Sequence, residues 1–125
     1  MKPEQLVFVV LGALFAGLAL PLMWRKVRPN GLYGLRVPST MKSEAVWYEA
    51  NAKCGRDMLL FGVIQMVLAA FLPHAGEFGR DYFLDINTAF LVIGPLICLF
   101  IGWRHANSLL DAERRRCRPQ EMSAP

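Results

Sequence analysis

Three apolar blocks separated by polar segments dominate the chain. Leu6–Trp24 is an apolar run of 19 residues without one charge, and two later runs cover Met58–Leu72 and Ile86–Trp103. A helix rises about 1.5 Å per residue, so the first run is long enough to cross a bilayer core of ~30 Å. Since backbone groups in hydrocarbon need partners within their own segment, each run is predicted to be a helix. The pattern therefore predicts an all-α membrane protein with three transmembrane helices.

The polar segments between the blocks set the predicted organisation. We expect a single membrane domain, 1–125, with spans at about 6–24, 56–73 and 86–103, a motif loop at 25–55 and a tail at 104–125. No proline occurs from Ser43 to Leu72, which predicts one long helix whose amphipathic first half extends the second span outside the hydrocarbon. Glu49 and Lys53 are expected to pair on it. Gln65 is expected to face protein, because lipid offers an amide no partner.

The first run could also be a signal peptide. Gly17 and Ala19 resemble a small-residue cleavage site. However, the run continues to Trp24, and its strong positive charge follows the run, whereas in a signal peptide the charge precedes it. We therefore expect a retained span.

The distribution of charge predicts the orientation. The net charge is +4, and twelve of the 14 Lys and Arg residues lie between the first and second apolar runs or after the third. The positive-inside rule then places these segments in the cytoplasm and the N-terminus outside, in a multi-pass protein of the cell membrane. The basic clusters are expected near anionic lipid headgroups, and no specific nucleic-acid binding is expected.

Small residues spaced by four recur in two spans and indicate close helix packing. They are Gly12 with Ala16, Ala13 with Gly17, and the series Gly94, Cys98 and Gly102. Such stripes could hold the three spans together, bind another membrane protein, or support a homo-oligomer.

Catalytic and metal-binding patterns are missing from the sequence. The three cysteines (Cys54, Cys98 and Cys117) and the isolated His74 and His105 match no metal-site spacing, and we expect no cofactor and no disulfide. No nucleophile–base set or phosphate loop occurs, so no enzyme is predicted. No charge lies deep in a span, which argues against a coupled transporter.

The most informative block runs from residue 29 to residue 55 and begins P-N-G-L-Y-G-L-R-V-P-S-T, whose Pro-Asn-Gly start predicts a turn. It resembles the SdpI/YfhL family, named for immunity to a sporulation-delaying toxin, whose members show Pro-Asn-x-x-Tyr/Phe-Gly-x-Arg-Thr-Pro, then Thr, then Trp-x-x-x-Asn before a span. Val37 departs from this pattern by replacing the usual threonine. The matching positions, with Gly55 one turn further on, are Pro29, Asn30, Tyr33, Gly34, Arg36, Pro38, Thr40, Trp47 and Asn51.

The resemblance implies a function. An SdpI-like protein would bind a membrane-active peptide toxin within the bilayer and so confer immunity. In some systems it would also hold a soluble repressor at the membrane. Longer members have additional N-terminal spans, so this chain resembles the motif-bearing C-terminal module alone.

The spacing of the motif residues predicts a cluster. Trp47, Asn51, Gly55 and Met58 fall on one face of a helix. Arg36 is predicted to fold back over Trp47 as a cation–π contact and to donate to Asn51. Two interpretations remain: the cluster only fastens the loop to the helix, or it forms a surface that recognises a partner.

A different functional class also fits the sequence. A small accessory subunit of a larger membrane complex would use its small-residue stripes to dock partner spans.

Overall fold

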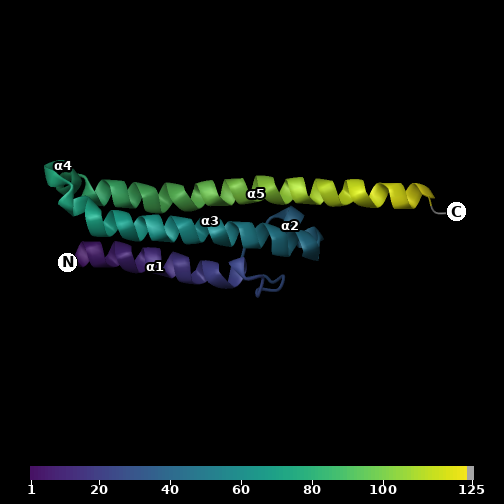
Figure 1. Ribbon diagram of the computed structural model, residues 1–125, viewed down its shortest axis with the longest axis horizontal. Coiled ribbons are helices and arrows are strands. Elements are labelled where there is room, and N and C mark those ends of the chain that lie inside the picture. The colour runs from purple at the N-terminus through teal and green to yellow at the C-terminus, as the bar shows by residue number, and fades with distance from the viewer. Residues whose placement is uncertain (124–125) are drawn as a thin grey trace.

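Three long helices lie roughly parallel in one layer (Figure 1). The computed structural model describes residues 1–123, without the side chains of residues 120, 121 and 123. The last two residues of the predicted tail, 124–125, lie outside this range. The elements are α1 (Pro3–Met23), α2 (Pro38–Lys42), α3 (Glu44–Phe71), the 3₁₀ helix η1 (Leu72–His74), α4 (Gly76–Asp81) and α5 (Phe83–Ser123).

The predicted fold class is confirmed. Helices α1, α3 with η1, and α5 are each long and apolar enough to cross a membrane, and residues 1–123 contain no strand. Helix α3 is the middle helix: α1 and α5 each pack along it (Figure 1). Helices α1 and α5 meet at Phe8 and Phe83, whose ring centroids are 5.7 Å apart. A single central helix therefore organises the domain.

The long second helix also forms as predicted. Ser43 is the N-cap of α3, and its hydroxyl accepts the backbone N–H of Val46 at 3.4 Å. The short helix α2, which precedes it, was not predicted. Helix α5 extends far beyond the predicted third span and continues as a helix through Pro119 to Ser123.

The predicted pairing of Glu49 with Lys53 is wrong. Lys53 instead pairs with Asp57, one turn further on, at 2.7 Å. Glu49 pairs with Arg25 at 2.6 Å. Tertiary packing explains the first pair: α1 lies against α3, so Arg25, just after α1, reaches Glu49. Lys53 pairs with Asp57 because this second acid also lies four residues away on the helix.

Small residues let α1 and α3 approach closely. A Cβ built on Gly62 would lie 2.8 Å from the backbone nitrogen of Ala16, and one on Gly55 would lie 2.9 Å from the carbonyl oxygen of Ala19. Gly12 meets Gly62 in the same interface. The Gly12/Ala16 stripe therefore serves packing within the chain, whereas Ala13 and Gly17 are exposed and Gly17 has nothing within 4 Å.

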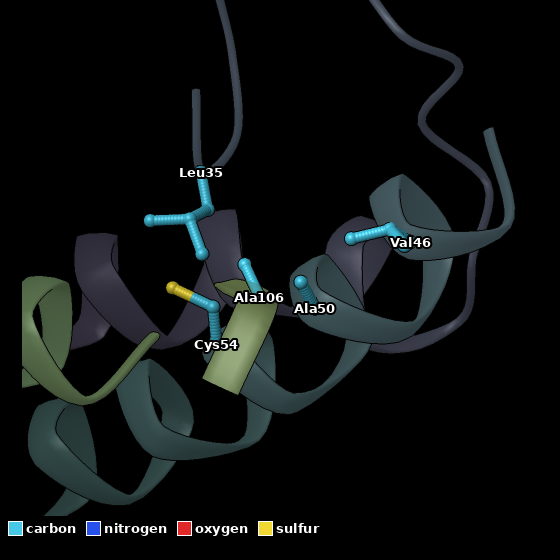
Figure 2. Packing of buried hydrophobic residues seen from close by; sticks show 5 residues of the cluster. All are labelled: Leu35, Val46, Ala50, Cys54 and Ala106. Carbon is cyan, nitrogen blue, oxygen red and sulfur yellow. The ribbon is translucent and has the colours of Figure 1, made fainter. Parts of the chain in front are cut away.

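The predicted stripe on the third span also faces the middle of the protein. Gly94 lies against Phe61 of α3, and Gly102 lies against Leu35. Leu35 belongs to a small core near the α1–α2 loop (residues 24–37), which Figure 2 shows. Its buried members are Leu35, Val46, Ala50, Cys54 and Ala106.

Gln65 faces protein, as predicted. Its side chain is fully buried and its amide nitrogen donates to the side-chain oxygen of Asn87 at 2.7 Å. Asn87 in turn donates to the carbonyl of Phe83, one turn back along α5, at 2.9 Å. This polar contact joins α3 to α5 at the end of the bundle away from the α1–α2 loop.

Candidate functional site

Asn51 is the centre of the motif cluster. Its side-chain oxygen accepts the backbone N–H of Leu35 at 2.5 Å, and its side-chain nitrogen donates to the carbonyl of Trp47 at 2.9 Å. Asn51 is only 2% exposed, so both polar ends of the amide are satisfied within the protein. The α1–α2 loop is thereby attached to α3 through a backbone hydrogen bond.

Trp47 makes the second attachment. Its indole N–H donates to the carbonyl of Val27 at 2.9 Å, and the side chain has no exposed area. Val27 lies near the start of the loop and Leu35 near its end, so Trp47 and Asn51 hold both ends of the loop against the same helix face. The spacing of Trp47 and Asn51, one turn apart, makes this possible.

Gly34 fits between these two side chains. It has φ +112°, a conformation that L side chains rarely adopt, and a Cβ there would lie 2.7 Å from the side-chain oxygen of Asn51 and 3.2 Å from the ring of Trp47. The glycine is therefore required both for backbone conformation and for space.

Thr40 closes the end of the loop. Its buried hydroxyl donates to the carbonyl of Leu35 at 2.8 Å and accepts the N–H of Val37 at 3.1 Å. Pro38 is the first residue of α2, where a proline costs no hydrogen bond. The side chain of Val37, where the family pattern has threonine, packs against the small core.

Asn30 shapes the beginning of the loop, where Pro-Asn-Gly predicted a turn. Its side-chain oxygen accepts the N–H groups of Leu32 and Tyr33, both at 2.8 Å, and its nitrogen donates to the carbonyl of Arg28 at 2.7 Å. Asparagine favours this local bonding because its side chain mimics a backbone turn.

The predicted contacts of Arg36 with Trp47 and Asn51 are wrong. Its side chain is exposed, and among the described residues the structure shows neither a hydrogen bond from Arg36 to Asn51 nor a cation–π contact with Trp47. Trp47 and Asn51 are already covered by Gly34 and bonded to loop backbone, so a guanidinium would have to be buried without an acid to reach them. Gly55 also lies apart from the loop, because it packs on α1 beside Ala19 and Met23.

Two contacts from the segment around α2 to α5 were missed by the sequence reasoning. The hydroxyl of Ser39 hydrogen-bonds to the side-chain oxygen of Asn107, and the hydroxyl of Ser43 donates to Glu113 at 2.9 Å. These partners are 68 and 70 residues apart in the chain, so no local signal could have indicated them.

A groove of about 320 Å³ opens beside the cluster, between α1 and α5. Its floor is α3 and its lining is almost entirely apolar. Tyr33, Gly34 and Leu35 of the α1–α2 loop form one end. The hydroxyl of Tyr33 is shielded and has no hydrogen-bond partner among the described residues. Burial, with a smaller contribution from the nearby Cys54 thiol, raises the pKa of this phenol.

The described residues contain no group of three or more His, Cys, Asp or Glu side chains that could hold a metal ion. The site consists of amide, hydroxyl and indole groups bonded to backbone. Such groups are suited to holding a loop in place.

The comparisons with known proteins agree with the motif. Neither the curated proteins nor the solved structures compared with this chain gave a match. Residues 26–109 match the profile of the SdpI/YfhL protein family, and this range contains the loop, the Trp47/Asn51 cluster and the two later spans. Because the match covers more than half of the 125 residues, the chain belongs to the SdpI/YfhL protein family.

Proposed function

We propose that this protein confers immunity to a membrane-active peptide toxin by binding it at the membrane. Membership of the SdpI/YfhL family supports the proposal. The protein would act by binding alone, without a cofactor or catalytic step.

The observation that carries the proposal is the exposure of Arg36 on an otherwise attached loop. Asn30, Thr40, Trp47 and Asn51 all use their side chains to hold the backbone of the loop. Arg36 is the charged residue of the motif, and its side chain is exposed. A rigid loop that presents a cation favours partner recognition over simple fastening, because little side-chain and backbone freedom is lost on binding.

The proposed location is the cell membrane, with the N-terminus outside and the α1–α2 loop in the cytoplasm. The basic residues of the loop and of the end of α5 lie on one side of the three helices, which supports this orientation by the positive-inside rule. Reporter fusions at Arg36, Glu77 and Ser123 test it. Cytoplasmic signals at the first and last positions and an external signal at Glu77 are expected, and the reverse pattern would refute the orientation.

A regulatory role is part of the proposal. Helix α5 continues well beyond the other elements (Figure 1) and carries Arg114, Arg115 and Arg116 on its projecting part. These exposed arginines would provide a docking surface for an acidic region of a soluble repressor.

An accessory subunit of a larger membrane complex is the second candidate. One observation favours it: Ala13 and Gly17 form a small-residue pair that remains exposed on α1 after the chain has packed its other stripes. Loss of copurifying membrane proteins in a Gly17→Leu variant would support this candidate.

Toxin challenge tests the primary function. Cells lacking the protein, and cells expressing the wild type, Arg36→Ala or Arg28→Ala, are exposed to a panel of candidate membrane-active peptide toxins. We expect survival with the wild type and with Arg28→Ala, because Arg28 is exposed but lies outside the motif. Arg36→Ala should lose protection while its thermal unfolding stays within about 0.5 kcal/mol of wild type.

Two outcomes would count against the proposal. Equal survival of all four strains would show that the protein confers no immunity to these toxins. Full protection by Arg36→Ala would show that the loop motif serves the fold alone.

A further inference from the structure

The groove between α1 and α5 runs along the apolar helices from the α1–α2 loop to Phe61. Helices α1 and α5 both pack on α3, and the groove lies between them along α3. At one end, Phe61 of α3 contacts Phe15 edge-on, with ring centroids 5.2 Å apart, and stacks on Phe90 at 4.9 Å. At the other end lie Tyr33, Gly34 and Leu35. Aromatic rings and the loop therefore close the groove at its two ends.

The sides of the groove open toward hydrocarbon. Leu18 on α1 and Leu99 on α5 both line the groove and are 44% and 51% exposed. Both residues lie in helices that are apolar enough to span a membrane, so the medium that reaches them is lipid. A soluble partner would have to pass the α1–α2 loop to enter.

The lining of the groove favours a lipid chain as its occupant. The groove has a volume of about 320 Å³, and its lining is almost entirely apolar. Because its sides open toward hydrocarbon, an extended acyl chain can enter it from the bilayer. Binding of a second copy of this chain is the alternative that the experiment must distinguish.

The chemistry at the loop end selects the kind of lipid. The Tyr33 hydroxyl is shielded from solvent and has no partner within the described residues. A buried hydroxyl without a hydrogen bond is costly, and an acyl chain alone would leave it so. An ester or phosphate oxygen of a phospholipid would accept its proton. Arg36 directly follows Leu35 in the chain and is exposed, so it would meet an anionic headgroup at this end.

We propose that the groove binds one acyl chain of an anionic phospholipid from the leaflet on the side of the α1–α2 loop, and that the Tyr33 hydroxyl donates to an oxygen of its headgroup region. The lipid would fill the space between α1 and α5 and join the loop to the spans. This inference is independent of toxin immunity.

Native mass spectrometry of the full chain in detergent tests the proposal. The probes are phosphatidylglycerol and phosphatidylcholine, which differ in headgroup charge. The groove variant is Cys98→Phe, because Cys98 lines the groove. Its matched control is Ile97→Phe, because Ile97 is the adjacent α5 residue, is 52% exposed and does not line the groove.

We expect the wild type and Ile97→Phe to retain one phosphatidylglycerol, with phosphatidylcholine retained at least fivefold more weakly. Cys98→Phe should retain at least tenfold less phosphatidylglycerol than the wild type. Tyr33→Phe keeps the ring and removes one oxygen, so it tests the site without repacking the groove, and its affinity should fall about threefold to tenfold.

Three results would overturn the assignment. The first is equal retention by Cys98→Phe and Ile97→Phe. The second is unchanged affinity in Tyr33→Phe. The third is a dimer that Cys98→Phe abolishes while lipid retention stays constant, which would assign the groove to a second copy of the chain.

Discussion

The side-chain oxygen of Asn51 accepts the backbone N–H of Leu35, which lies sixteen residues earlier in the chain, at 2.5 Å. This bond attaches the α1–α2 loop to the middle helix, and Gly34, Trp47 and Thr40 complete the attachment. The arrangement explains why the motif combines a loop with a helix face. The helix side chains Asn51 and Trp47 supply the hydrogen-bond partners of loop backbone groups at Leu35 and Val27.

Replacing Asn51 should release the loop. Asn51→Ala leaves the buried N–H of Leu35 without a partner, so we expect the free energy of unfolding to fall by about 1–3 kcal/mol. Thermal unfolding in detergent, followed by circular dichroism, measures the change. Arg36→Ala is the control and should unfold like wild type, because its side chain is exposed. A larger loss in Arg36→Ala than in Asn51→Ala would contradict the described geometry.

Gly34→Ala should destabilise the protein by about 1–3 kcal/mol, because the new Cβ is strained at a positive φ. It would also lie only 2.7 Å from the Asn51 oxygen. The same substitution at Gly31, which has nothing within 4 Å, is the matched control. Comparison of the two unfolding temperatures tests the prediction, and equal temperatures would contradict it.

The approach of α1 to α3 predicts a difference between two glycines. Gly62→Val places a side chain against the backbone of Gly12 and Ala16, and overpacking of this kind costs about 1–3 kcal/mol. Gly17→Val should be neutral, because Gly17 is exposed on the outer face of α1. Protease resistance and thermal unfolding in detergent should both separate the two variants. Similar behaviour would mean that α1 packs through its other face.

The buried pair Gln65 and Asn87 should be energetically coupled. Asn87→Leu leaves the amide nitrogen of Gln65 without its partner, whereas Gln65→Leu with Asn87→Leu removes both groups. We expect the double variant to lose less stability than the two single variants together, by about 0.6 kcal/mol and at most about 1.7 kcal/mol, the average and the maximum for such contacts between membrane helices. A double-mutant cycle on unfolding in detergent measures this quantity, and strict additivity would contradict the contact.

The raised pKa of Tyr33 predicts a pH dependence at alkaline pH. Below the ordinary value of 10.0 the phenol is neutral in both the folded and unfolded states, so Tyr33 causes no change in stability there. Above pH 10 the unfolded state loses the proton first, and the folded state is progressively disfavoured. The difference in unfolding temperature between wild type and Tyr33→Phe should therefore stay constant from pH 7 to pH 9. Above pH 10 the unfolding temperature of the wild type should fall relative to that of Tyr33→Phe. A constant difference up to pH 11.5 would contradict the burial of this hydroxyl.

Local pattern was enough to predict several features. The apolar runs predicted three helices, the absence of proline predicted the long α3, and the Pro-Asn-Gly sequence predicted the turn at Asn30. The sequence predicted that Gln65 faces protein, because lipid offers an amide no hydrogen-bond partner. Nothing in the local sequence identified Asn87 as that partner.

The role of Arg36 shows why the site itself was harder to predict. Sequence proximity and charge favoured a contact with Trp47, but Gly34 and the loop carbonyl of Val27 occupy that position. Likewise, Glu49 and Lys53 have ideal helical spacing, yet Arg25 and Asp57 are their partners. Competition between several possible partners is decided by three-dimensional distance, which a linear pattern does not contain.

The sequence by itself determined that three segments favour hydrocarbon, that their backbones must be helical there, and that basic residues gather on one side of them. Only the tertiary structure decided that α3 is the middle helix, that Asn51 and Trp47 hold the loop while Arg36 is exposed, and that a groove remains between α1 and α5. The physical reason is that transfer into lipid depends on the composition of each segment, whereas packing and hydrogen bonding depend on which distant residues meet.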